Sequence, residues 1–241
     1  MPSFTTSQHS ALESFARDLD DVFGARLRAL VAYPGSHGDG SVHSCAIVDA
    51  LSFEDLRKCL PFTSRWHQRR IAVPLMLSQD ELPRTLDIFP LEYAAIAADH
   101  LVLRGADPFA GLVVPAADLR RATEAQAKSH LIHLREAYLE SHGETTRVAR
   151  LIAASTPSLR ALLSNLARLV DGPATTMNAT INDDALAGMA ETRMGVSPGV
   201  IRDVLAASTE GSSMITDPSH LLALYVEASE RIWSFVDGWT A

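Results

Sequence analysis

The chain has 241 residues, 47% of them hydrophobic, which is enough to bury a substantial core in one large domain or two modest ones. Lysine and arginine total 21 against 29 aspartate and glutamate, and the net charge of -8 argues against a nucleic acid partner. The two cysteines, Cys45 and Cys59, have no metal-site spacing, and no basic leader or membrane-length apolar run occurs. These features predict a reduced, cytoplasmic protein without a membrane span.

The first elements along the chain are a helix and two strands. Apolar residues recur every three or four positions over Ser10–Gly24, which predicts an amphipathic helix. Two short apolar strands follow, Leu27–Tyr33 and Ser44–Leu51, and the loop between them is rich in glycine and includes Gly35. We therefore expect a strand, loop and strand at the centre of a sheet.

The next elements alternate between helix and strand. Ser52 is placed to cap a helix, and we expect Pro61 to close it. Strand-forming residues fill Ile71–Leu77, where Pro74 favours an edge position. The segment Leu91–Leu103 fits both helix and strand, and we expect two short strand-like or mixed pieces there.

The character of the chain changes near Pro115, beyond which the pattern is helical. We expect an α/β domain over 1–115 and an all-helical bundle of about five helices over 116–241, packed together without a flexible linker. The helices or helix starts expected in the second part are Leu119–Ser141, Arg147–Ser155, Thr156-Pro157, Ser197-Pro198 and Asp217-Pro218.

Several segments together resemble a bacterial family of nucleotidyltransferase-like proteins. The resemblance extends from about residue 25 to the C-terminus. It implies a nucleotidyltransferase-fold domain with a mixed sheet and flanking helices, followed by a helical bundle. The segments that carry it are LSFEDLRKC, PLMLSQDELPRTLDIFPLEYAAI, HLVLRGADPFAGL, DLRRATEAQAKSHLIHLREAYLES and VDGWTA.

The resemblance also implies where a nucleotide would bind. Members of the fold carry a Gly-Ser loop after the first strand, and Gly35 and Ser36 match it. They also carry an Asp-x-Asp pair on the second strand, but the matching positions here are Ser44 and Ala46. Nucleotidyl transfer uses two Mg²⁺ ions held by clustered carboxylates, so the loss of this pair predicts the loss of conventional catalysis.

Other carboxylates could replace the missing pair in an active enzyme. Asp49 lies at the far end of the second strand, Asp39 lies in the loop, and Asp87 or Glu92 could supply a third ligand. Gly35, Ser36, Asp49 and Glu92 are therefore the candidate nucleotide-binding residues. No residue is assigned as catalytic and no metal ligand set is assigned.

Three functions follow from these observations. The preferred one is a nucleotidyltransferase-fold protein that has lost conventional activity and binds a ligand or protein partner in a cleft between sheet and bundle. The first alternative is an active, Mg²⁺-dependent nucleotidyltransferase that uses Asp49 with Asp87 or Glu92. The second is a structural module whose C-terminal helix forms a homodimer.

Two histidine patterns have weaker functional interpretations. His130 and His133 lie three positions apart on a helix with Glu136 nearby, a spacing that can hold zinc or iron, but no fourth ligand is evident. Arg135 and His142 resemble the Arg-x6-His ribonuclease motif of helical nucleotide-binding domains, and seven residues bring them to one side of a helix. Surface residues are the simpler interpretation in both cases.

One basic cluster stands out in an otherwise acidic chain. Arg65, Arg69 and Arg70 surround Trp66 and His67. A solvated helix end is the simpler interpretation, and contact with a phosphate or a nucleic acid is the alternative.

Overall fold

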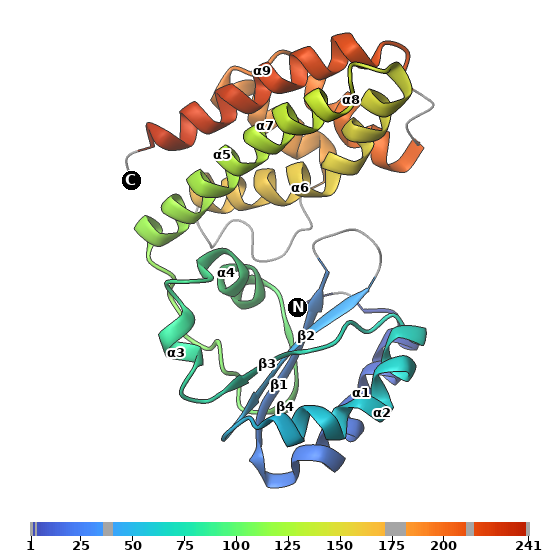
Figure 1. The fold of residues 1–241 in the computed structure, drawn as a ribbon. Coiled ribbons are helices and arrows are strands. Elements are labelled where there is room, and N and C mark those ends of the chain that lie inside the picture. Colours follow the sequence, from blue (N-terminus) through green and yellow to red (C-terminus); the bar gives the residue numbers. More distant parts are fainter. Residues whose placement is uncertain (1, 3, 36–40, 172–181, 211–214, 240–241) are drawn as a thin grey trace. The chain divides into compact units, whose positions relative to one another are not determined.

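The computed structural model divides the chain into two compact units, Met1–Val114 and Pro115–Ala241, and each is described by itself. The structure describes all residues except 1, 3, 36–40, 172–181, 211–214 and 240–241 (Figure 1). The division lies next to the boundary expected after residue 115. The expected α+β class, a mixed sheet with flanking helices and a helical C-terminal part, is confirmed.

A four-stranded mixed sheet forms the centre of the first unit, in the order β3-β2-β1-β4. Strands β1 (Leu27–Pro34) and β2 (Val42–Val48) pair antiparallel. Strand β4 (Leu101–Gly105) pairs antiparallel with β1, and β3 (Leu75–Ser78) pairs parallel with β2. Both central strands are buried over most of their length, which explains their continuous apolar sequences, because helices cover both faces of the sheet.

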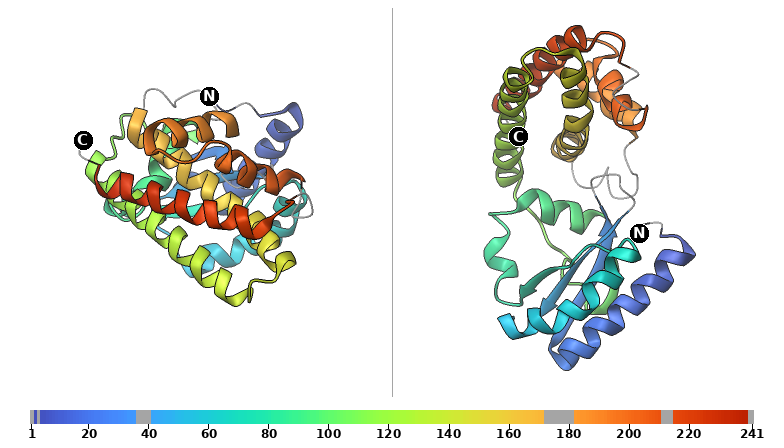
Figure 2. Two further views of the ribbon diagram at one scale, coloured as in Figure 1. Left: turned by 90° about the horizontal axis from the view of Figure 1, so that it is seen from above. Right: turned by 45° about the vertical axis from the view of Figure 1, so that its right-hand side comes forward.

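One face of the sheet is covered by α1 (Thr6–Phe23) and α2 (Phe53–Gln68), which lie side by side in Figures 1 and 2. Thr5 caps α1 and forms a capping box with Gln8, and the short 3₁₀ turn Gly24–Arg26 leads into β1. The buried side chains of this layer are Leu12, Phe15, Ala16, Leu19, Phe23, Leu30, Ala32, Val42, Ala46, Val48, Cys59, Trp66 and Ile71.

Helix α2 does not end at Pro61, so that expectation is wrong. Pro61 lies inside the helix with its side chain exposed. Proline removes one intrahelical hydrogen bond, but the freed carbonyl of Arg57 belongs to an exposed turn where water can satisfy it. The helix continues because Trp66, one turn further on, is buried against Phe15 with ring centroids 5.1 Å apart.

The other face of the sheet packs against α3 (Leu82–Thr85) and α4 (Pro90–Ala98). The segment expected as two strand-like or mixed pieces is therefore a helix, α4, followed by a strand, β4. The third strand is shorter than expected and begins after Pro74. The buried side chains of this layer are Ala29, Val31, Cys45, Ile47, Tyr93, Ile96 and Phe109.

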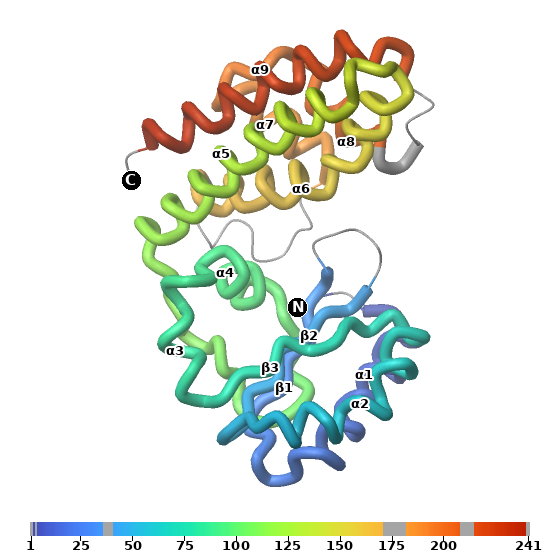
Figure 3. Tube along the Cα trace, viewed as in Figure 1, coloured from blue at the N-terminus to red at the C-terminus, as the bar shows by residue number. Residues whose placement is uncertain are grey.

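The second unit consists, in its described residues, of five helices that Figure 3 follows along the chain. Leucine, alanine and valine side chains from all five helices form one core, with Tyr225 fully buried among them. The helices are α5 (Ala116–Glu140), α6 (Thr145–Asp171), α7 (Asp183–Met194), α8 (Val200–Glu210) and α9 (Pro218–Asp237).

The helix boundaries of the second unit differ from the expected ones in several places, and the helix expected to start at Ser197-Pro198 begins only at Val200, after a turn. Pro157 does not start a helix; it lies inside the continuous α6. The preceding Thr156 is buried, and its hydroxyl lies 3.2 Å from the carbonyl oxygen of Ile152 and 3.0 Å from that of Val204, so it ties α6 to α8 instead of capping a new helix. Helix α7 was not expected, because its apolar residues form no regular stripe.

No helix in the described part of the chain is both long and apolar enough to cross a bilayer.

Candidate functional site

The turn end of the β1–β2 hairpin brings Gly35 against the ring of His43. The Gly35 amide donates to the carbonyl oxygen of Ser41 at 3.2 Å. A Cβ atom on Gly35 would lie 2.8 Å from two atoms of the His43 ring, so a side chain cannot be added without moving that ring. His43 also pairs in register with Tyr33, and their ring centroids lie 5.9 Å apart. Local packing therefore explains the glycine, and Ser36, which was expected to act with it, lies outside the described residues.

The ionisable groups near this end of the sheet include Tyr33 and Glu92, and Glu92 acts on the pKa of Tyr33. Burial raises the pKa of Tyr33 to about 12, and the neighbouring Cys45, Glu92 and Tyr93 raise it further. Glu92 itself is exposed in the first turn of α4. The Cys45 thiol is buried and its pKa is raised to about 12 by that burial, so it remains a protonated, unreactive thiol. Among the described residues, this end of the sheet thus offers the phenol of Tyr33, the imidazole of His43 and the carboxylate of Glu92.

The structure places Asp49 at the opposite end of the sheet from Gly35. Asp49 follows the last residue of β2, whereas the glycine turn precedes the first, and the strand between them is about 20 Å long. Its carboxylate accepts two hydrogen bonds from the guanidinium of Arg28, one of them at 2.8 Å from Nη2. This ion pair lowers the pKa of Asp49, so a cation would have to displace Arg28 to reach the carboxylate. Gly35 and Asp49 are therefore not parts of one site.

Ser44 and Ala46, the positions matched to the missing acid pair, face the layer formed by α1 and α2. Both are buried, at 1% and 0% exposure. The Ser44 hydroxyl has no hydrogen-bond partner within the described residues. Alternation along β2 instead places His43 and Cys45 on the face covered by α4. A carboxylate at Ser44 or Ala46 would lie in an apolar core in this arrangement.

The remaining acidic candidate that the structure describes is Asp87, which is exposed between α3 and α4. Asp39 lies in the part of the loop that is not described. Across the described residues, no group of three or more histidine, cysteine, aspartate or glutamate side chains is placed to hold a metal ion.

The ring of His130 lies in the core of the helical bundle, where both of its nitrogens lie within hydrogen-bonding distance of hydroxyl groups. It is 6% exposed, with Nδ1 3.1 Å from the hydroxyl of Ser158 and Nε2 2.7 Å from the hydroxyl of Tyr225. Burial lowers its pKa to about 4, so the ring is neutral at pH 7. His133 and Glu136 are exposed on the outer side of α5. These three residues therefore do not converge on one point.

Arg135 and His142 do not share one helix face. Helix α5 ends at Glu140, and His142 lies beyond it with a positive φ of 55°. The guanidinium of Arg135 forms an ion pair with Glu230 of α9. The helix end therefore removes the geometry on which the ribonuclease-like interpretation depended.

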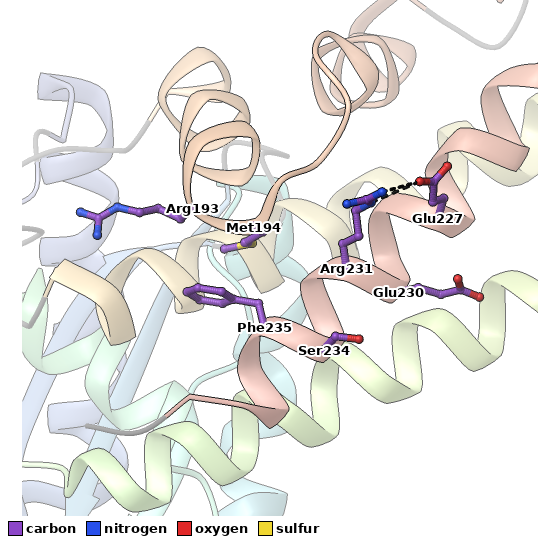
Figure 4. A pocket seen from close by; sticks show the side chains of 7 residues that line it. All are labelled: Arg193, Met194, Glu227, Glu230, Arg231, Ser234 and Phe235. Atoms are coloured by element: carbon purple, nitrogen blue, oxygen red, sulfur yellow. Dashed lines mark hydrogen bonds and ion pairs between the residues drawn. The ribbon is translucent and has the colours of Figure 1, made fainter.

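A hollow on the surface of the second unit lies between the end of α7 and one side of α9 (Figure 4). In Figure 4, Arg231 points to Glu227, and the two groups are 2.9 Å apart, whereas Arg193 extends away from them. Glu230, at the rim, is paired with Arg135. The charges of this hollow are largely neutralised by their neighbours, and it favours no particular ligand.

The comparisons with known proteins add no relative to this picture. A scan against protein-family models and a search of the curated proteins each found no match for this chain.

Sequence reasoning missed the roles of Tyr33 and Arg28. Tyr33 stands opposite His43 as soon as the hairpin register is fixed, but the register depends on a loop whose length the sequence does not specify. Arg28 lies near the start of β1 and Asp49 follows the end of β2. In an antiparallel pair these two ends are adjacent, so the pairing would have suggested their contact.

Proposed function

We propose that the first unit is a nucleotidyltransferase-like scaffold that has lost conventional catalysis and binds a ligand or protein partner. The observation that best supports this proposal is the separation of Asp49 from the glycine turn, together with its ion pair to Arg28. Two-metal transfer needs carboxylates only a few ångströms apart beside the phosphates. Of the candidate carboxylates within the described residues, Glu92 is the one whose charge acts on Tyr33.

The side chains at the turn end suit binding better than transfer. Tyr33 keeps its proton at neutral pH because burial raises its pKa, so it can donate a hydrogen bond. The ring of His43 lies beside it, and the exposed carboxylate of Glu92 can accept hydrogen bonds. Such a group can hold a polar ligand or a peptide without a metal ion.

Thermal unfolding with ATP or CTP, in Mg²⁺ and in EDTA, tests this proposal. We expect any nucleotide-induced rise in Tm to be the same with and without Mg²⁺, and the same in Asp49→Asn as in the wild type. Arg28→Gln is the matched control, because it breaks the same ion pair and keeps the carboxylate. A rise in Tm that needs Mg²⁺, and that Asp49→Asn or Glu92→Gln abolishes while Arg28→Gln retains it, would show a metal-bound nucleotide at these carboxylates and favour the active transferase instead.

Static light scattering separates the proposal from the structural alternative. A monomer across the concentration range is expected for a ligand-binding scaffold. A dimer that persists on dilution and is lost on charge substitution in α9 would favour the dimerisation module.

A further inference from the structure

A groove with a volume of about 980 Å³ runs along one face of α1 beside the residues that follow α2. Its α1 side is built from Ser7, Ser10 and Ser14, which recur at three- and four-residue intervals and so share one face of the helix. Guanidinium groups approach it from both elements. We call it the arginine groove, after Arg17, Arg69 and Arg70 in its lining.

The arginines of the groove differ from most others in the chain because they lack a carboxylate partner. Within the described residues, the side chains of Arg69 and Arg70 make no hydrogen bond or ion pair, and no acidic residue lines the groove. The Nε of Arg17 donates to the carbonyl oxygen of Glu13 at 3.3 Å, which leaves its charge uncompensated. By contrast, the nearby Arg65 is paired with the buried Asp18, which also accepts from Trp66 Nε1 at 2.9 Å.

The backbone holds Arg70 firmly in an unusual conformation. Its φ is +56°, in the left-handed region that glycine adopts readily and other residues avoid. Its N–H donates to the carbonyl oxygen of His67 at 2.9 Å, and its own carbonyl accepts from the N–H of Val42 at 2.8 Å. The hydrogen bond to Val42, at the start of β2, therefore fixes the backbone of Arg70 at the groove. Glycine would adopt this backbone conformation with less strain than arginine.

The N-terminus of α1 contributes less than the arginines. The amide of Gln8 is bonded to the Thr5 hydroxyl at 3.2 Å, and the Thr5 amide is bonded to the Gln8 side chain at 2.9 Å. The capping box thus satisfies part of the helix end internally. The positive character of the groove comes mainly from three guanidinium groups.

We propose that the arginine groove binds a small molecule that carries two or three linked phosphates. Guanidinium groups match phosphate oxygens in pairs of hydrogen bonds, and the serine hydroxyls can donate to the remaining oxygens. A groove of about 980 Å³ is large enough for a nucleotide-sized ligand. The net charge of -8 disfavours a long polyanion such as RNA. This site lies on the α1–α2 face of the sheet, so it does not depend on the function proposed for Tyr33, His43 and Glu92 on the other face.

Calorimetric titration with inorganic tripolyphosphate in EDTA tests the proposal on the full chain. We expect saturable binding that Arg70→Gly weakens about tenfold or more, because the variant removes one guanidinium while relieving the strained backbone. Arg69→Gln should weaken binding similarly. If the Tm of Arg70→Gly equals or exceeds that of the wild type, the lost affinity is not caused by unfolding.

Two variants serve as matched controls. Arg57→Gln removes one positive charge from α2 outside the groove, where Arg57 is paired with Glu54. His142→Gly relieves the other non-glycine residue with positive φ in the described chain and leaves the groove unchanged. Both should bind tripolyphosphate like the wild type.

The outcomes separate the possible ligands. Tighter binding of ATP than of tripolyphosphate would support the proposal and assign a nucleotide, and equal affinities would support it and assign the polyphosphate group alone. Absence of saturable binding would overturn it, as would an equal loss of affinity in Arg57→Gln. Displacement of tripolyphosphate by a single-stranded oligonucleotide at lower concentration would overturn the small-molecule assignment.

Discussion

The buried imidazole of His130 should make the second unit sensitive to acid. His130 is 6% exposed and lies between the hydroxyls of Ser158 and Tyr225 at 3.1 and 2.7 Å. Burial, with a smaller effect of His133, lowers its pKa from 6.5 to about 4. The folded chain therefore keeps this ring neutral at a pH where the unfolded chain protonates it.

The expected loss of stability follows from these two pKa values. Well above pH 6.5, from about pH 7.5 upward, the ring is almost entirely neutral in both states and has almost no effect on the pH dependence. As the pH falls from 7.5 to about 5, the unfolded state gains a proton that the folded state does not, which lowers the free energy of unfolding by about 2 kcal/mol. The loss continues until the pH reaches about 4, where the folded ring is protonated as well.

Urea unfolding at the two pH values measures this loss. In a Trp66→Phe background the tryptophan fluorescence comes from Trp233 and Trp239, which both belong to the second unit. His130→Gln should remove most of the loss, because glutamine keeps hydrogen-bonding groups and does not titrate. His133→Gln, which changes an exposed ring, should retain it. Equal pH dependence in the wild type and His130→Gln would refute the reasoning.

Three further predictions concern the first unit, each measured as the free energy of unfolding in urea. Asp55→Ala should lower the free energy of unfolding by about 2 kcal/mol, because the buried carboxylate accepts hydrogen bonds from Arg26 at 2.6 Å and from the Ser52 hydroxyl at 2.7 Å. These hydrogen bonds, above all the one from Arg26, hold the pKa of Asp55 well below its usual range, so the stabilisation is present above about pH 4 and is lost on further acidification. An unchanged stability of the variant would contradict the role of this network. Gly105→Ala should lower the free energy of unfolding by about 2 kcal/mol or more, because the φ of Gly105 is +71° and the new Cβ would lie 1.8 Å from the carbonyl oxygen of Arg28. A loss no larger than that of an ordinary surface substitution would show that β4 ends with a different backbone conformation. Pro61→Ala should raise stability by about 1 to 3 kcal/mol because it restores a hydrogen bond inside α2, whereas a decrease would mean that the proline fits its turn without strain.

The fold class was predictable because each main element has a strong local pattern. The apolar runs of β1 and β2, the amphipathic pattern of α1 and the proline start of α9 all correspond to observed elements. The two expectations that rest on proline, a helix end at Pro61 and a helix start at Pro157, are both wrong. In both helices tertiary packing, of Trp66 in α2 and of Thr156 against α8, outweighs one lost hydrogen bond.

The candidate site was less predictable because it depends on which strand ends meet. The family pattern points to Gly35, and Glu92 is a candidate only as a possible replacement carboxylate; in the structure its charge acts on Tyr33. The sequence already places Asp49 at the far end of the second strand, and the structure adds the ion pair with Arg28 that occupies its carboxylate. The sequence shows the basic cluster that includes Arg69 and Arg70, with phosphate contact as one interpretation, but it does not show the other wall of the groove, which comes from α1, more than fifty residues earlier.

The most direct test of the central claim is the number of Mn²⁺ ions that the protein binds together with ATP or CTP, measured by electron paramagnetic resonance. A scaffold without a two-metal centre predicts only the Mn²⁺ that the nucleotide itself carries, unchanged in Asp49→Asn and Glu92→Gln. Two Mn²⁺ ions per chain, lost in either variant, would contradict it.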